Sequence, residues 1–362
     1  MLTSYKQIFI YKILRKSDYF SSFKYINSQI QLINDNIDYN SKIPNRKLFF
    51  LLALTPAACY NRTMILSVSR RTDVPAFYGE WFLNRLKEGF VCVRNPMNGR
   101  QISRVQLSPG RIEAIVFWTK NPAEPFLEKL NMIEERGFRF YFQFTLTPYG
   151  AEIEPGLPPK KEICGRFRRL ARKIGRDNVV WRYDPILFND TWTPEEHRRR
   201  FAAYAETLDG SSDTCVISFL DVYPAIRKRL TAAGIREPSP GQIKETASAL
   251  AETAAVFGLR LETCAETVDL ESAGIVHGRC IDPQRIARLT GRPFSFRKDK
   301  GQRPACGCAE SLDIGTYGTC PHGCLYCYAR RNDGSRTACD VHSPLLCSVI
   351  RPGDTVTDCR RR

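Results

Sequence analysis

The first 63 residues contain no glycine, although the sequence holds 23 glycines in all. This segment is rich in Ile, Asn, Lys, Tyr, Phe and Ser, whereas the remainder is rich in Arg, Ala, Gly and Pro. Its nine Lys and Arg against three Asp and Glu supply +6 of the net charge of +16. We therefore expect residues 1–63 to be a non-native or disordered extension, with Met64 as the true start.

No apolar run reaches the roughly eighteen residues that a membrane-spanning helix needs. The run Leu48 to Leu54 follows Arg46-Lys47, as in a targeting segment, but it is too short for a span. It also lies unusually far from residue 1 for a signal peptide. The sequence therefore predicts a protein without a membrane partner. With 43% hydrophobic and 25% charged residues, the composition is that of a globular chain, long enough for one barrel-sized domain or two smaller ones.

Fourteen cysteines would indicate disulfides in a small secreted domain. In a chain this long, clustering at C-x-C and C-x3-C-x2-C spacing instead indicates a metal or cluster site, and hence a reducing cytoplasm. Cys320, Cys324 and Cys327 place three thiolates on one short loop, which suits a [4Fe–4S] cluster better than a single tetrahedral ion. Three ligands leave one iron open for a substrate or cofactor. Tyr326 is positioned to shield such a cluster from water.

This loop, with an aromatic residue before its third cysteine, resembles the cluster loop of the radical S-adenosylmethionine (SAM) superfamily. The resemblance implies that the three cysteines hold a [4Fe–4S] cluster whose fourth iron is chelated by the amino and carboxylate groups of SAM. It also implies that an electron from a donor such as a flavodoxin or ferredoxin cleaves SAM to methionine and a 5′-deoxyadenosyl radical. That radical would abstract hydrogen from a substrate, either a small molecule or a nucleic acid.

From about Met64 onward the sequence also resembles a bacterial family, the DUF1848 proteins. The shared segments are Ser-Val-Ser-Arg-Arg-Thr-Asp-Val-Pro (67–75), Phe-Trp-Thr-Lys-Asn-Pro (117–122), Trp-Arg-Tyr-Asp-Pro (181–185) and the cysteine-rich end. The resemblance to the DUF1848 proteins implies no particular reaction.

Between residues 64 and 270, short apolar runs alternate with amphipathic stretches, which predicts a parallel sheet with right-handed crossovers. Six strands fit either an incomplete (β/α) barrel of TIM-like type or a doubly wound sheet. The expected strands are Ile65–Ser69, Ala114–Trp118, Phe138–Leu146, Val179–Tyr183, Cys215–Leu220 and Leu259–Thr263. The expected helices are Tyr78–Glu88, Pro122–Glu135, Glu162–Ile174, Pro194–Leu208 and Pro240–Phe257.

Polar residues follow each expected strand and favour the barrel, because the carboxyl ends of parallel barrel strands meet on one face. Arg70 and Arg71 either clamp a phosphate or carboxylate or form structural salt bridges with Asp73 and Asp184. No catalytic residue is assigned. The candidate substrate- or SAM-binding residues are Arg70, Arg71, Asp73, Lys120, Arg182 and Asp184, together with Tyr326 of the loop.

We expect a barrel-like domain over residues 64–270 and a cysteine-rich, cluster-binding region over 271–362 that closes it. Four further cysteines from three segments are enough for a second [4Fe–4S] cluster or a structural zinc: Cys264, Cys280, Cys306 and Cys308. His322, inside the main loop, is expected to support it rather than to bind metal. The other cysteines show no ligand spacing. We expect Cys92, Cys164 and Cys215 to be buried apolar residues. Cys59 lies in the extension, and Cys339, Cys347 and Cys359 lie beyond the loop.

Chain order departs from the radical SAM pattern, in which the cysteine loop follows the first barrel strand. Here it follows six expected strands. A circularly permuted barrel reconciles the two, with Asp313–Thr319 supplying the strand that precedes the loop. If the cysteine region is instead an appended module, the cluster serves electron transfer or structure only.

Two other functions fit the same sequence. One is a cluster-bearing electron-transfer or redox-sensing protein. The other is a zinc-stabilised nucleic-acid-binding module, whose basic residues 160–176 and 198–200 would track phosphates. A solvated helix face is the favoured explanation of these basic residues, and without residues 1–63 the net charge is a moderate +10.

Overall fold

The structure is a computed structural model, and it describes residues 63–293, 295–330 and 339–359. These residues belong to one compact unit. The expected extension, apart from Thr63, and Cys59 within it lie outside the described residues.

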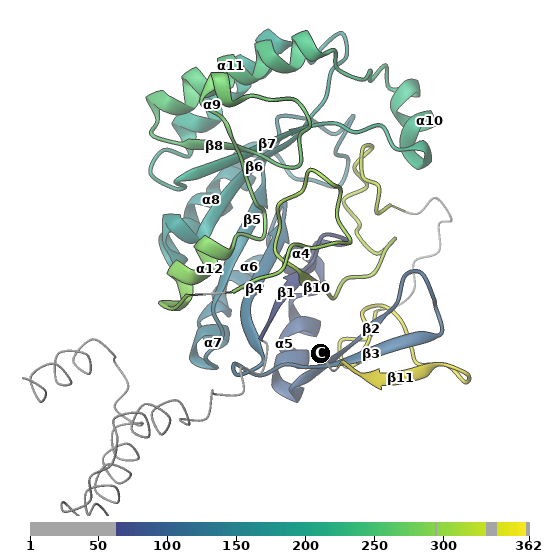
Figure 1. Ribbon diagram of the computed structural model, residues 1–362. Coiled ribbons are helices and arrows are strands. Elements are labelled where there is room, and N and C mark those ends of the chain that lie inside the picture. The colour runs from purple at the N-terminus through teal and green to yellow at the C-terminus, as the bar shows by residue number, and fades with distance from the viewer. Residues whose placement is uncertain (1–62, 294, 331–338, 360–362) are drawn as a thin grey trace, which may run out of the picture. The chain divides into compact units, whose positions relative to one another are not determined.

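An eight-stranded parallel sheet forms the centre of this unit, in the order β10-β1-β4-β5-β6-β7-β8-β9 (Figure 1). All six expected strands are present, which confirms the mixed α/β class and the parallel sheet. Its edge strands, β10 and β9, do not pair with each other among the described residues. The strands are β1 Met64–Val68, β4 Ile112–Thr119, β5 Phe140–Thr145, β6 Val179–Ile186, β7 Thr214–Phe219, β8 Arg260–Thr263, β9 Val276–His277 and β10 Ser311–Asp313.

The central strands read as continuous apolar runs because both faces of the sheet are buried. Successive side chains alternate between the faces. Leu66 and Phe117 pack with residues of the helices in the main core. Their neighbours Ile65 and Val116 belong to a second core, which lines what we call the inner face and is covered by residues 280–309.

Helices connect the strands much as the sequence predicts, and α9 begins at an N-cap where the Glu196 amide donates to Thr193 Oγ1 at 3.3 Å. The expected helix Pro122–Glu135 is two short helices that meet at Lys129. The helices are α4 Val74–Phe77, α5 Gly79–Glu88, α6 Glu124–Glu128, α7 Leu130–Glu135, α8 Lys160–Ile174, α9 Pro194–Thr207, α10 Pro224–Ala232, α11 Pro240–Val256 and α12 Pro283–Thr290, with the short 3-10 turns η1 Arg176–Asn178 and η2 Glu271–Ala273.

A second, three-stranded sheet has the order β11-β3-β2 and was not predicted from the sequence. Strands β2 (Phe90–Arg94) and β3 (Gln101–Gln106) form an antiparallel pair, and β11 (Thr355–Asp358) lies parallel to β3. The chain after residue 270 therefore contributes strands to both sheets. Among the helices of the described residues, none has the length and apolar character to cross a membrane.

Candidate functional site

The cysteine loop lies directly after β10, which pairs in parallel with β1 at the edge of the large sheet. The strand expected at Asp313–Thr319 is not formed there: β10 is Ser311–Asp313, and residues 314–319 are not in a strand. Asp313 fixes this edge, because its carboxylate accepts hydrogen bonds from Ser67 Oγ at 2.8 Å and Ser69 Oγ at 2.6 Å. The loop therefore starts at the carboxyl end of the sheet, beside the end of β1.

Asp73 joins the cysteine loop to the ends of β1 and β4. Its Oδ2 lies 2.9 Å from His322 Nε2 and accepts a hydrogen bond from the Lys120 amide at 2.8 Å. Its Oδ1 caps α4 by accepting from the Ala76 amide at 3.0 Å. The Gly156 amide donates to the His322 carbonyl at 2.9 Å. His322 is thus held as a supporting residue of the loop.

Glu154 is the buried centre of a second set of contacts to the loop. Its carboxylate accepts hydrogen bonds from Lys120 Nζ and Thr147 Oγ1, both at 2.8 Å, and also from Lys160 Nζ and the Tyr326 hydroxyl. Burial favours the neutral acid, but the charges of Lys120 and Lys160 outweigh it and lower the pKa of Glu154 to about 2. The ionised carboxylate therefore anchors Tyr326, the aromatic residue of the loop, to the ends of β4 and β5.

The three loop cysteines differ in burial: Cys324 is buried, whereas Cys320 and Cys327 are half-buried. Burial raises the pKa of the Cys320 and Cys324 thiols to about 12, and electrostatic interaction with Cys327 also raises the pKa of each. Nowhere in the described part of the chain do three or more His, Cys, Asp or Glu side chains already have the arrangement of ligands around one metal ion. A [4Fe–4S] cluster requires a different ligand geometry, because each of its thiolates binds a separate iron.

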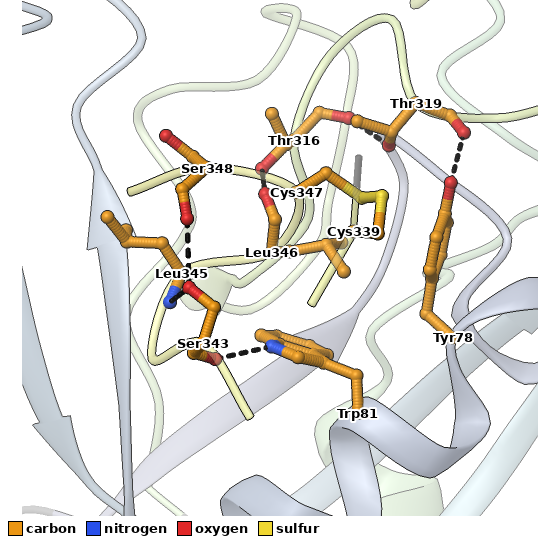
Figure 2. Close-up of a disulfide and its surroundings, with 10 residues drawn as sticks. All are labelled: Tyr78, Trp81, Thr316, Thr319, Cys339, Ser343, Leu345, Leu346, Cys347 and Ser348. Carbon is orange, nitrogen blue, oxygen red and sulfur yellow. Dashed lines mark hydrogen bonds between the residues drawn. A yellow bond between two sulfur atoms is a disulfide. The ribbon is translucent and has the colours of Figure 1, made fainter. Parts of the chain in front are cut away.

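A cavity of about 450 Å³ reaches Cys320 from the outside of the loop. Figure 2 shows part of its wall, where the Tyr78 hydroxyl donates to the Thr319 carbonyl and Thr316 Oγ1 donates to the Leu346 carbonyl. The disulfide between Cys339 and Cys347 lines the same cavity. This pairing was not predicted from the sequence. The other eleven cysteines in the described residues are free, and Cys92, Cys164 and Cys215 are buried as expected.

The second set of cysteines lies in one buried cluster, in which Cys280, Cys306 and Cys308 pack together and Cys264 packs against them. The Cys280 thiol donates to Cys264 Sγ at 3.1 Å. Arg182 donates to Cys280 Sγ at 2.7 Å. The cluster lies against the inner face of the sheet and includes Ile286 of α12.

The model of the protein family described as "Domain of unknown function (DUF1848)" matches residues 65–329. The chain belongs to this family. No curated protein matches the sequence significantly. The DUF1848 region runs from β1 to the end of the cysteine loop, so it contains both sets of cysteines. It ends before Cys339, so the disulfide and β11 lie outside it.

Within this DUF1848 fold, the contacts of the predicted binding residues divide them into two groups. Asp73 and Lys120 hold the cysteine loop, which contains Tyr326. Arg70, Arg182 and Asp184 lie by the second set of cysteines, where Arg182 pairs with Asp184 and Arg70 with Asp299. Arg71 joins neither group: it donates to the Gly315 carbonyl at 3.3 Å and lies 5.1 Å from the ring centre of Tyr317.

Sequence reasoning missed two residues of these sites. Glu154 stands in Ala-Glu-Ile-Glu-Pro with no motif around it, so only the fold reveals that four donors meet on its carboxylate. Trp118 was noted only as part of a strand end. Its ring lies between two guanidinium groups, 5.1 Å from that of Arg70 and 5.3 Å from that of Arg182.

Proposed function

We propose that this DUF1848 protein is an iron–sulfur enzyme of radical SAM type. Cys320, Cys324 and Cys327 hold a [4Fe–4S] cluster, and SAM binds the iron that the protein leaves open. The observation that carries the proposal is the place of the cysteine loop, directly after β10 and next to β1. The order β10-β1-β4-β5-β6-β7 then corresponds to an incomplete, circularly permuted barrel in which the cysteine loop follows the first strand.

When bound, the cluster and SAM supply a one-electron cleavage of the sulfonium that begins radical chemistry, with a flavodoxin or ferredoxin as electron donor. The protein's residues position this site and keep water from it. Asp73 and His322 fix the first half of the loop to β1, and Glu154 with its two lysines fixes the second half through Tyr326. The cavity at Cys320 has the size of a small-molecule site and is the proposed entry for SAM or substrate.

The inner face of the sheet supports an active site at its carboxyl end. On this face, five strands carry an inner-core residue: Ile65, Val116, Tyr141, Val180 and Val216. Two residues further along each strand, the same face carries Ser67, Trp118, Gln143, Arg182 and Ser218. The change from apolar to polar on one face, repeated on neighbouring strands, is the pattern of a barrel interior that opens into a binding site.

The nucleic-acid alternative receives less support from α9, because the basic residues there are paired with carboxylates. The three consecutive arginines 198–200 pair with Glu195 and Glu196 one turn before them. On α8, Arg166 and Arg169 share Glu124. The arginines of α9 are therefore largely neutralised rather than a strip of free cations.

The test uses the full chain, purified without oxygen. We expect iron and sulfide in a ratio near one to one, and an electron paramagnetic resonance spectrum of the reduced protein that changes on addition of SAM. The variants Cys320→Ala, Cys324→Ala and Cys327→Ala should each abolish formation of 5′-deoxyadenosine, whereas Cys164→Ala, which removes a buried cysteine of the helix-packed core, should retain it. Undiminished SAM cleavage in a loop variant would sink the proposal, as would a wild-type protein that holds zinc without iron.

A further inference from the structure

The four cysteines on the inner face belong to one buried cluster. Cys264 directly follows β8, and Cys280 lies 3.1 Å from it, sulfur to sulfur. Cys306 and Cys308 lie in the same cluster as Cys280, and the Cys308 sulfur accepts a hydrogen bond from the Ile281 amide at 3.4 Å. Cys280, Cys306 and Cys308 are buried, and Cys264 is half-buried. Four soft donors from three separate segments thus share one site.

The sheet holds the backbone of this site in place. The Cys280 carbonyl accepts hydrogen bonds from the Tyr141 hydroxyl and from Gln143 Nε2, both at 2.7 Å. The Ala309 amide donates to the Ile281 carbonyl at 3.0 Å, which ties the segment around Cys280 to the one around Cys308. The cysteines therefore meet because residues on β5 and the two segments themselves bring them together.

Two guanidinium groups adjoin the four thiols. Arg182 donates to Cys280 Sγ at 2.7 Å, and Arg70 interacts electrostatically with Cys308 and Cys280. Arg182 is also paired with Asp184, but Arg70 Nη2 is buried and makes no hydrogen bond to any atom of the described residues. The Arg70 amide donates to Asp313 Oδ2 at 2.8 Å, and its guanidinium Nη1 lies 3.7 Å from Asp299 Oδ2.

A buried cation without a full set of partners is costly, and four neutral thiols offer it little compensation. Four thiolates around a doubly positive core carry two net negative charges, which two arginines would offset. The unpartnered Nη2 of Arg70 thus indicates that the neighbouring thiol site carries negative charge, which neutral thiols do not supply.

We propose that Cys264, Cys280, Cys306 and Cys308 form a four-thiolate metal centre, distinct from the loop cluster, whose negative charge is offset by Arg70 and Arg182. The donor set suits zinc or a [4Fe–4S] cluster. At 3.1 Å, the Cys264 and Cys280 sulfurs lie closer than the roughly 3.8 Å expected between two ligands of a tetrahedral site with Zn–S bonds of about 2.3 Å. Metal binding therefore displaces the thiol protons and moves the sulfurs apart.

The test separates this centre from the loop cluster. The full chain carrying Cys320→Ala, Cys324→Ala and Cys327→Ala together is purified without oxygen, and iron, sulfide and zinc are measured per chain. We expect one centre to remain, either as one zinc or as four iron and four sulfide, and this result identifies the metal. Adding Cys306→Ala should remove it, whereas adding Cys215→Ala, a buried cysteine of the main core, should not.

The proposal is overturned if the folded triple variant holds neither metal after incubation with Zn²⁺ alone and with Fe²⁺ and sulfide. It is also overturned if a disulfide between Cys264 and Cys280, found by mass spectrometry, is all that these thiols form. Because the loop cysteines are absent from this protein, failure of the radical SAM proposal leaves the result unchanged.

The arginines give a second readout that does not need the cysteines to be altered. In the triple variant, Arg70→Gln should weaken metal retention against a chelator about 10-fold or more, the usual effect of removing a partner just outside the ligands. Arg198→Gln, on the exposed face of α9, is the matched control and should have no effect. Equal retention in both variants would exclude the proposed role of Arg70.

Discussion

Gly156 is the position where one added methyl group should displace the cysteine loop. A Cβ at this residue would lie 2.7 Å from both the Cα and the carbonyl oxygen of His322, and 2.8 Å from the carbonyl oxygen of Pro321. Ordinary van der Waals contact begins near 3.4 Å, so Gly156→Ala leaves the two segments about 0.7 Å too close. The obstructing atoms are all backbone, so no side-chain rotation relieves the contact.

Gly156→Ala should therefore destabilise the protein by about 1–3 kcal/mol, the usual range for overpacking a well-packed site. It should also lower iron content and SAM cleavage, because Cys320 and Cys324 flank the displaced residues. The measurements are urea unfolding, iron per chain and formation of 5′-deoxyadenosine.

Gly165→Ala is the matched control for this change. Gly165 lies within α8, and a Cβ there meets nothing within 4 Å. This variant should be more stable than wild type by about 0.5–1 kcal/mol, because alanine is the better helix former. If Gly156→Ala unfolds at the wild-type urea concentration and keeps its iron, the close approach of residue 156 to the loop is refuted.

Three further variants probe other parts of the fold. Glu154→Gln leaves the buried amines of Lys120 and Lys160 without their carboxylate and should cost about 3–5 kcal/mol in urea unfolding; adding Lys120→Met should recover part of it, and no loss in the single variant contradicts the network. Burial lowers the pKa of His197 to about 4, below its value of about 6.5 in the unfolded chain, so the unfolded state binds the proton first as pH falls. Stability should then drop by about 2 kcal/mol between pH 7 and pH 5, and a slope unchanged in His197→Gln would argue against this cause. Reducing the disulfide, or Cys347→Ser, should cost about 2.5 kcal/mol because the pair closes a loop with a sequence separation of 8; unfolding that is indifferent to reductant counts against it.

The six central strands could be predicted from the sequence because five of them are buried on both faces, the sixth, β8, alternates exposed or half-buried with buried residues, and helices separate them. β10 could not, since Ser311-Leu-Asp313 is three residues long, half-buried and without periodicity. Every residue of β11 is exposed, and the strand forms only because β3 lies beside it. Both strands depend on partners more than two hundred residues away in the sequence, which local patterns do not contain.

The candidate site also contains residues that sequence patterns predict and residues that only the fold brings together. Cysteine spacing identified the loop, and the density of cysteines identified the second set, because thiol chemistry is visible in composition. The convergence of Glu154 with two lysines, and of Trp118 with two arginines, depends on which strand ends adjoin. Strand order therefore had to be known before these groups could be found.

The strand order also explains why a second centre would lie where it does. From β9 at one edge of the sheet to β10 at the other, the chain must cross every strand between them, and it does so over the inner face with α12 as its one helix in the described residues. Ordering so long a connection costs conformational entropy that one short helix does little to offset. Cys280 lies where this crossing begins, Cys306 and Cys308 lie where it ends, and Cys264 lies on the strand end beneath it. A four-thiolate centre would fasten both ends of the crossing to the sheet, and so would place β10, and with it the cysteine loop, beside β1.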